Sequence, residues 1–181
     1  SLISSGASQS ESRQMLMSPE LMLSETMPEK TSSVALGMGL GREPKCALPY
    51  ISWLLSHPEV PCVIDADAFS SPALPELLAS RPCGIVLTPH AKEFCALLSA
   101  CGLAAGADGC GGLSADEALR RRPQLMEAFC RKYPGAVLLV KGANVMIGYY
   151  TESGMQLLIN PLGTAALAKA GSGDVLSGLI A

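Results

Sequence analysis

The sequence predicts an α/β fold in which helices cover both faces of a mostly parallel sheet. Short apolar runs alternate with longer segments of helical pattern, and this alternation is typical of parallel strands joined by helical crossovers. Polar or glycine-rich stretches follow directly after several of the apolar runs. Because the carboxyl ends of parallel strands share one edge, where ligand sites lie, we expect a single ligand-binding cleft at that edge.

Length, composition and charge exclude several classes of protein. The chain has 181 residues, of which 49% are hydrophobic and 16% are charged, so we expect one globular domain with a substantial core. The net charge of −3 is not that of a nucleic-acid-binding protein. No apolar run approaches the roughly 20 residues that span a bilayer, so we expect no membrane partner.

The chain has seven cysteines, and none of them forms a C-x-x-C pair. The pattern therefore gives no sign of a zinc site or of thioredoxin-type chemistry, and we predict no metal-binding side chains. Free cysteines in apolar surroundings are typical of a reduced compartment, which predicts a cytoplasmic protein. A cysteine nucleophile paired with His57 or His90 is an alternative that no local signature supports.

Two strands are predicted in the first part of the chain, each followed by a motif that suits a ligand. The strand over 33–36 meets the glycine-rich turn 37–41, where a ligand could approach the backbone closely. A helix over 48–55 leads to a strand over 61–64, which runs into Asp65-Ala66-Asp67. These acids could bind Mg²⁺ through water, or a ribose hydroxyl, or they could cap a turn.

The next strand is predicted over 84–87, after a short helix over 72–79. It leads into Thr88-Pro89-His90 and a helix that begins at Ala91. Proline and glutamate close to that start are ordinary N-terminal signals of a helix. The imidazole of His90 could donate to or accept from a ligand, or it could be a structural residue of the turn.

The segment 102–112 is rich in small residues and predicts a surface loop. A helix is expected over 115–133, with Ser114 as its cap and Glu117 completing a capping box. Pro123 lies inside this helical pattern, so we expect the helix to kink or split there.

Three more strands are predicted near the end, over 136–140, 145–150 and 155–159. Lys141 follows the first of them and could neutralise a phosphate. Gly142 and Asn144 both suit a tight turn, so a plain β-hairpin is the alternative explanation of this stretch.

The last segment, residues 160–181, carries the motif that most favours chemistry. Small residues lead into Gly171-Ser172-Gly173-Asp174, and the apolar run that follows predicts a helix with Asp174 at its start. Glycines let a ligand approach the backbone, and the free amides of a first helical turn bind phosphate. Asp174 could then take a proton from a hydroxyl that attacks phosphorus. The alternative is an ordinary helix capped by Ser172 or Asp174.

Both ends of the chain look incomplete. The first 20 residues have no strong period, and the chain stops at Ala181 within a helical pattern and without a cap. We therefore expect residues 1–181 to form a single domain that is represented only in part.

Several motifs together resemble one family. They are LGMGLG (36–41), VIDADAF (63–69), VLTPHAKEF (86–94), VKGANVMI (140–147) and the segment 160–181. In this order they resemble the ADP/ATP-dependent NAD(P)H-hydrate dehydratases, a ribokinase-like (carbohydrate-kinase-like) domain often fused to an NAD(P)H-hydrate epimerase. The likeness covers roughly residues 34–181, which makes it more specific than any single motif.

The resemblance implies a repair reaction. A nucleotide phosphorylates the hydroxyl of the (6S)-hydrate of NADH or NADPH, and loss of phosphate restores the reduced cofactor. Bacterial members of the family usually use ADP and release AMP, so ADP, or else ATP, is the implied co-substrate, with Mg²⁺ bridging phosphates. A homo-oligomer and a fused or separate epimerase are further expectations from the family.

The resemblance also assigns roles to residues of this sequence. Asp174 is implied as the catalytic base, and Gly39, His90 and Asp174 as contacts of the hydrated cofactor. The amides of Gly171, Ser172 and Gly173 are implied to hold the transferring phosphoryl group. The implied nucleotide-binding residues are Lys141, Gly142, Ala143, Asn144, Val145 and Gly173. The family commonly has threonine where this chain has Val145.

Two other functions stay open from the sequence. The G-S-G-D element would also fit a ribokinase-like small-molecule kinase, for a sugar or a vitamin, with Asp174 as the base. The chain could instead be a non-catalytic nucleotide-binding relative. The replacement Asp174→Asn separates the enzyme hypotheses, which predict loss of turnover, from the binding-only hypothesis, which predicts no loss.

Overall fold

A computed structural model of the chain describes residues 2–3, 23–24, 26–41, 43–104, 112–163 and 169–181. The chain divides into two compact units, Ser1–Ser32 and Ser33–Ala181. Within the first unit, β1 (Leu2–Ile3) pairs in parallel with β2 (Leu23–Ser24). The second unit contains every motif that the sequence singles out.

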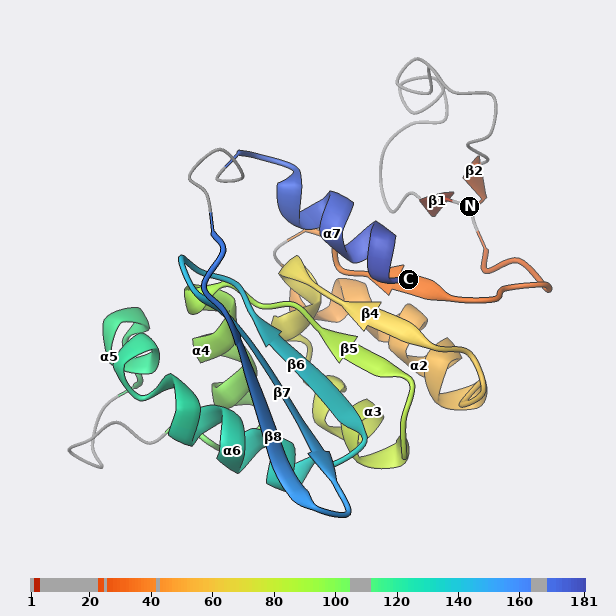
Figure 1. Ribbon diagram of the computed structural model, residues 1–181. Helices are drawn as coiled ribbons and strands as arrows, with labels where there is room; N and C mark the ends of the chain where they lie inside the picture. Colours follow the sequence, from red (N-terminus) through yellow and green to blue (C-terminus); the bar gives the residue numbers. More distant parts are fainter. Residues whose placement is uncertain (1, 4–22, 25, 42, 105–111, 164–168) are drawn as a thin grey trace. The chain divides into compact units, whose positions relative to one another are not determined.

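A six-stranded sheet forms the centre of the second unit, with the strand order β3-β4-β5-β6-β7-β8 (Figure 1). The neighbouring pairs from β3 to β6 are parallel, and β7 and β8 are added as antiparallel strands. The predicted mostly parallel sheet is therefore confirmed. The strands are β3 (Val34–Leu36), β4 (Cys62–Ile64), β5 (Ile85–Leu87), β6 (Ala136–Val140), β7 (Val145–Thr151) and β8 (Gly154–Asn160).

The helices follow the predicted alternation with the strands. They are η1 (Pro44–Ala47), α2 (Leu48–Ser56), η2 (Ala66–Ser70), α3 (Leu74–Ser80), α4 (Ala91–Ala100), α5 (Ala115–Arg120), α6 (Arg122–Lys132) and α7 (Ser172–Ile180). Figure 1 shows α2, α3, α4 and α6 behind the sheet. They lie on one face because right-handed crossovers that join successive neighbouring strands place their helices on the same side of the sheet. None of the helices in these ranges has the length and apolar character that crossing a bilayer requires.

The predicted break near Pro123 is confirmed. The hydroxyl of Ser114 accepts a hydrogen bond from the amide of Glu117 at 3.2 Å and caps α5. Helix α5 ends at Arg120, and α6 starts with Pro123 in its first turn, where a missing N–H is harmless. The small-residue loop predicted just before α5 lies mostly outside the described residues.

The main core lies between the sheet and the helices behind it. Alternate strand residues, such as Ile64, Leu87 and Leu138, are fully buried there, as the two-residue period of a strand requires. The protein's three phenylalanines are also buried on this side, one each in η2, α4 and α6: Phe69, Phe94 and Phe129. At about 25 cal/mol per Å² of apolar surface, such side chains supply most of the folding free energy.

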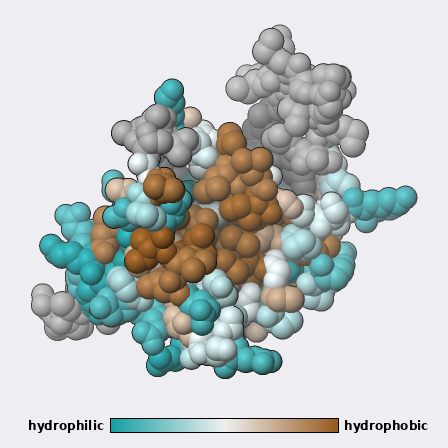
Figure 2. Space-filling view, viewed as in Figure 1, coloured by the Kyte–Doolittle hydropathy of each residue, from teal (hydrophilic) through white to brown (hydrophobic). Residues whose placement is uncertain are grey.

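The opposite face of the sheet is apolar as well. Val63, Val86 and Val137 are register partners across β4, β5 and β6 and project to this face. Figure 2, in the same view as Figure 1, shows apolar residues gathered over this region. The exposed large apolar side chains of the chain include Leu158 in β8 and Leu179 in α7.

One buried arginine joins the segments at the amino edge of the sheet. The guanidinium of Arg81 is 3% exposed and donates to the carbonyl oxygens of Val60 at 2.7 Å and of Leu54 at 2.8 Å. It also donates to the carbonyl oxygen of His57 at 3.1 Å. Arg81 therefore adds a charged donor to carbonyl groups at the end of α2 and in the segment that leads to β4.

Candidate active site at the carboxyl edge of the sheet

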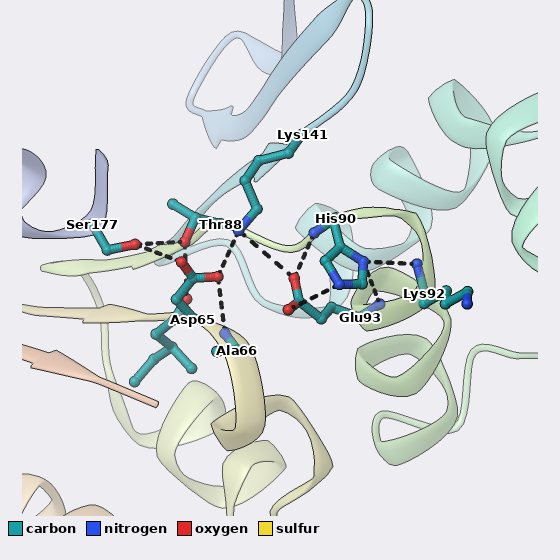
Figure 3. Close-up of polar contacts among 9 residues, drawn as sticks. Asp65, Ala66, Thr88, His90, Lys92, Glu93, Lys141 and Ser177 are labelled. Carbon is teal, nitrogen blue, oxygen red and sulfur yellow. Dashed lines mark hydrogen bonds and ion pairs between the residues drawn. The ribbon is translucent and has the colours of Figure 1, made fainter. Parts of the chain in front are cut away.

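The carboxylate of Asp65 lies at the centre of a polar cluster at the carboxyl edge of the sheet (Figure 3). Asp65 follows β4 directly and is 1% exposed. Its Oδ1 accepts from the amide of Ala66 at 2.9 Å and from Nζ of Lys141 at 2.8 Å, and its Oδ2 accepts from Oγ of Ser177 at 2.7 Å. A buried carboxylate needs such donors, because unpaired charge is strongly disfavoured inside a protein.

Lys141 connects three of the predicted motifs. It follows β6, and its Nζ lies 2.8 Å from Oδ1 of Asp65 and 3.7 Å from Oε2 of Glu93. Its backbone amide donates to the carbonyl oxygen of Pro89 at 2.8 Å. The ammonium group that was expected to neutralise a phosphate therefore already has one close carboxylate partner.

The glycine-rich turn and the Asp65-Ala66-Asp67 motif are in direct contact. Gly37 has φ +130°, and a Cβ atom at this position would lie 1.6 Å from the carbonyl oxygen of Asp65, so only glycine fits. The carboxylate of Asp67 accepts from the amide of Gly41 at 3.0 Å. These contacts, with Asp65 as the cap of η2, give both acids the turn and cap roles that were the structural alternative. Gly39 lies in the same turn and is exposed.

His90 is the cap of α4. Its Nδ1 accepts from the amides of Lys92 at 3.1 Å and Glu93 at 3.3 Å, and its Nε2 lies 3.1 Å from Oε1 of Glu93. These contacts fit the neutral tautomer with the proton on Nε2. The carboxylate of Glu93 accepts from the amide of His90 at 2.7 Å and completes a capping box. The structural alternative for His90 is thus confirmed, while its side chain remains 51% exposed.

The stretch Lys141–Asn144 is a turn between antiparallel strands, so the β-hairpin expected as the alternative is present. Gly142, Ala143 and Asn144 are exposed, and Val145 begins β7. A Cβ atom on Gly163 would lie 2.4 Å from the carbonyl oxygen of Ala143. The chain that follows β8 therefore packs against the turn that the resemblance assigns to nucleotide.

Helix α7 begins where the sequence predicts, but its cap differs. The alternative of a cap by Ser172 or Asp174 is wrong, because the N-cap residue is Gly171, with φ +84° and no side chain to accept a hydrogen bond. Glycine readily adopts this left-handed conformation. Asp174 lies in the first turn and is exposed. Residues 164–168, which precede this turn, lie outside the described part of the chain.

The start of α7 lies beside the polar cluster, on the face of the sheet opposite the other helices. A Cβ atom on Gly173 would lie 3.2 Å from Nζ of Lys141 and 3.8 Å from Oδ2 of Asp65. The missing side chain therefore allows α7 to approach this ion pair closely. The amides of a first helical turn and a nearby lysine together suit a phosphate group.

The structure also places residues at this edge that sequence reasoning did not select. Asp65 was considered as a ligand of Mg²⁺ through water, as a ligand of a ribose hydroxyl or as a cap, but not as the centre of a cluster, and Glu93 was considered only as a helix-start signal. Thr88 and Ser177 are fully buried polar residues whose hydroxyl oxygens lie 3.3 Å apart. A serine inside the apolar run of α7 was the one available signal for Ser177.

No group of three or more His, Cys, Asp or Glu side chains that could hold a metal ion occurs in the ranges that the structure describes. Two buried cysteines are also unsuited to act as nucleophiles. Burial raises the pKa of Cys62 to about 11 and that of Cys130 to about 12. Both side chains are therefore thiols near neutral pH and poor nucleophiles.

Comparison with known structures agrees with a ribokinase-like fold. A ribokinase-like superfamily protein from Enterococcus faecalis superposes with a TM-score of 0.50 at 21% identity, over 83% of this chain and 46% of that one. A hypothetical protein from Streptococcus mutans superposes with a TM-score of 0.54 at 23% identity, over 83% of this chain and 48% of that one. At this level of identity the likeness concerns the fold alone.

Residues 5–181 match the profile of the NAD(P)H-hydrate dehydratase family, and the chain belongs to this family. It is 42% identical over 161 residues to the bifunctional NAD(P)H-hydrate repair enzyme Nnr of Helicobacter pylori, covering 89% of this chain and 30% of that protein. It is 31% identical over 155 residues to the ADP-dependent (S)-NAD(P)H-hydrate dehydratase of Nitrosopumilus maritimus, covering 86% of this chain and 47% of that protein. The chain thus spans less than half the length of these relatives.

Proposed function

We propose that the protein restores NADH and NADPH from their (6S)-hydrates in a nucleotide-dependent dehydration. The observation that carries this proposal is the exposed Asp174 in the first turn of α7, next to Gly173, which packs against Lys141. Family membership supports the substrate class. The relative from Nitrosopumilus maritimus is named as ADP-dependent, so we propose ADP as the co-substrate, with ATP as the alternative.

The first step of the proposed reaction is phosphoryl transfer. The carboxylate of Asp174 would take the proton of the hydrate's hydroxyl while that oxygen forms a bond to the terminal phosphorus of the nucleotide. The bond from this phosphorus to the bridging oxygen breaks, and AMP leaves when ADP is the donor. The charge that develops on the phosphoryl oxygens would be stabilised by the amides of residues 171–173.

The second step is elimination. The bond between the ring carbon and the phosphorylated oxygen breaks, phosphate leaves, and a proton is lost from the neighbouring carbon. The carbon–carbon double bond of the reduced nicotinamide is thereby restored. Phosphate is a better leaving group than hydroxide, which is the chemical reason to phosphorylate the hydroxyl first.

The two ligands would approach the edge from different motifs. We propose that the nucleotide contacts the turn 141–145 and Gly173, and that the hydrated cofactor contacts Gly39, His90 and Asp174. The exposed turn and the half-exposed imidazole leave both regions open to ligands. Mg²⁺ would be held by the nucleotide's phosphates and water, since the described residues offer no ligand cluster, and it would offset phosphate charge.

Three further features concern partners, location and assembly. The bifunctional names of several relatives suggest that an epimerase of the hydrate acts with this protein, on the same or a separate polypeptide. The buried thiols favour a reducing, cytoplasmic location. A homo-oligomer is expected from the resemblance alone, and light scattering would measure it.

The test is an assay with hydrated NADH, Mg²⁺ and either ADP or ATP, in which the absorbance of reduced nicotinamide is followed. Nucleotide-dependent recovery with release of free phosphate is the expected result. A stable phosphorylated product without recovery would instead indicate a small-molecule kinase. Nucleotide binding with no reaction would indicate a non-catalytic relative.

A further inference from the structure

Asp65 joins the two segments that the proposed transfer step must bring together. One carboxylate oxygen accepts from Lys141, which begins the proposed nucleotide turn, and the other accepts from Ser177 on α7. Ser177 follows Asp174 by three residues, so the two lie within one helical turn of each other. Figure 3 shows the carboxylate between the lysine and the serine. A single buried group therefore fixes both segments, one with each oxygen.

Helix α7 has little else to hold it in the described part of the chain. Ser177 is its one buried residue, whereas Val175 is 63% exposed and Leu179 is 80% exposed. The hydroxyl of Thr88 lies 3.3 Å from that of Ser177 and adds a second polar neighbour from the end of β5. Leu176 is partly buried, and the hydrogen bonds of Ser177 are the buried polar contacts that hold α7 in the described structure.

Asp65 is itself held firmly enough to serve as a fixed point. Its amide donates to the carbonyl oxygen of Leu36 at 2.9 Å, and Gly37 lies against its carbonyl oxygen. The next residue, Ala66, has φ +49°, a left-handed conformation that alanine adopts only where the surroundings enforce it. The backbone on both sides of Asp65 is thus constrained.

We propose that Ser177, through its hydrogen bond to Asp65, is a positioning residue that sets Asp174 against the nucleotide turn. Ser177 touches neither nucleotide nor substrate in this scheme. It acts by fixing α7 to the carboxylate that also fixes Lys141. This inference rests on the proposed function in one respect, namely that Asp174 and the nucleotide must meet during phosphoryl transfer.

The replacement Ser177→Ala tests the proposal, because it removes the link to α7 and leaves the bond between Lys141 and Asp65. We expect kcat to fall by about 10- to 100-fold, since a displacement near 1 Å of a catalytic group has effects of this size. The affinity for ADP should fall by less than kcat does, because the proposed nucleotide turn 141–145 is untouched and a poorly placed base mainly affects the transition state. The matched control is Ser71→Ala, which removes another fully buried serine hydroxyl, one without a hydrogen-bond partner in the described structure.

Two measurements distinguish a displaced α7 from a loss of folded protein. Turnover is expressed per ADP-binding site, so that a loss of folded protein does not count as a loss of kcat. Amide hydrogen exchange is measured without ligands, and Ser177→Ala is expected to speed exchange in residues 172–180 while Ser71→Ala does not. Unchanged kcat per site, or unchanged exchange in α7, would overturn the proposal. If the unmodified protein shows no dehydratase activity, the proposed function fails, and the exchange result still decides whether Ser177 positions the helix.

Discussion

Replacing Gly37 by alanine should disrupt the junction between the glycine-rich turn and Asp65. A Cβ atom at this position would lie 1.6 Å from the carbonyl oxygen of Asp65, whereas ordinary contacts begin near 3.4 Å. The backbone would have to move by well over an ångström, and the obstacle is another backbone atom rather than a flexible side chain. The φ of +130° is itself a conformation that residues with a side chain rarely adopt.

The expected loss of stability has two contributions, the positive φ and the overlap with the carbonyl oxygen of Asp65. A residue held in such a disfavoured conformation costs about 1–3 kcal/mol, and relief of the overlap by backbone shifts adds about 1–3 kcal/mol. We therefore expect Gly37→Ala to lower the free energy of unfolding by roughly 2–6 kcal/mol. Domains of this size are stable by only about 5–15 kcal/mol, so the variant would be close to the limit of folding.

Urea unfolding followed by circular dichroism measures this difference, and Gly39→Ala is the matched control. Gly39 lies in the same turn with φ +68°, but a Cβ atom there would meet nothing within 4 Å. The control should therefore lose only about 1–2 kcal/mol, the cost of the left-handed conformation. Equal losses in the two variants would refute the contact between Gly37 and Asp65 as the cause.

Two other predictions concern the stability of the fold. Arg81→Met should lower the free energy of unfolding by about 2–4 kcal/mol in the same urea assay, because three buried carbonyl groups lose a charged donor. Arg131→Met, which breaks only an exposed ion pair, should lower it by no more than about 0.5 kcal/mol, and equal effects would contradict the assigned role. Burial raises the pKa of Cys62 from 9.0 to about 11 and that of Cys130 from 9.0 to about 12, so the thiols of the unfolded chain ionise first. The free energy of unfolding is then unaffected by these thiols below pH 9 and falls above it, by up to about 1.4 kcal/mol per pH unit for each thiol. A double variant, Cys62→Ala with Cys130→Ala, should show a shallower fall between pH 9 and 11. The same slope in both proteins would exclude these thiols as the cause.

Much of the fold could be predicted because its strands and helices follow simple periodic patterns. The buried runs 61–64, 84–87 and 136–140 all became central parallel strands. Pro123 marked a helix boundary because its ring and missing N–H are incompatible with a helix interior. The position of the polar motifs at one edge of the sheet could also be predicted, since the carboxyl ends of parallel strands lie on the same side.

The centre of the polar cluster could not be predicted, because it depends on contacts between distant segments. Nothing local to Asp65 indicates that its partners come 76 and 112 positions later in the sequence. The cap of α7 was mistaken because Ser172 and Asp174 are common cap residues, whereas a left-handed glycine precedes the helix. For His90, a structural role in the turn was expected only as the alternative to ligand binding. The structure shows that role, because His90 caps α4 in a complete capping box.

The most direct test of the proposed function compares the unmodified protein with Asp174→Asn, using hydrated NADH, Mg²⁺ and ADP. The amide of asparagine has nearly the same shape but cannot accept the hydroxyl proton. We therefore expect kcat to fall by about 10²- to 10⁴-fold, while ADP binding, measured by calorimetry, stays nearly unchanged. Recovery of reduced nicotinamide at the same rate in both proteins would contradict the assignment of Asp174 as the catalytic base.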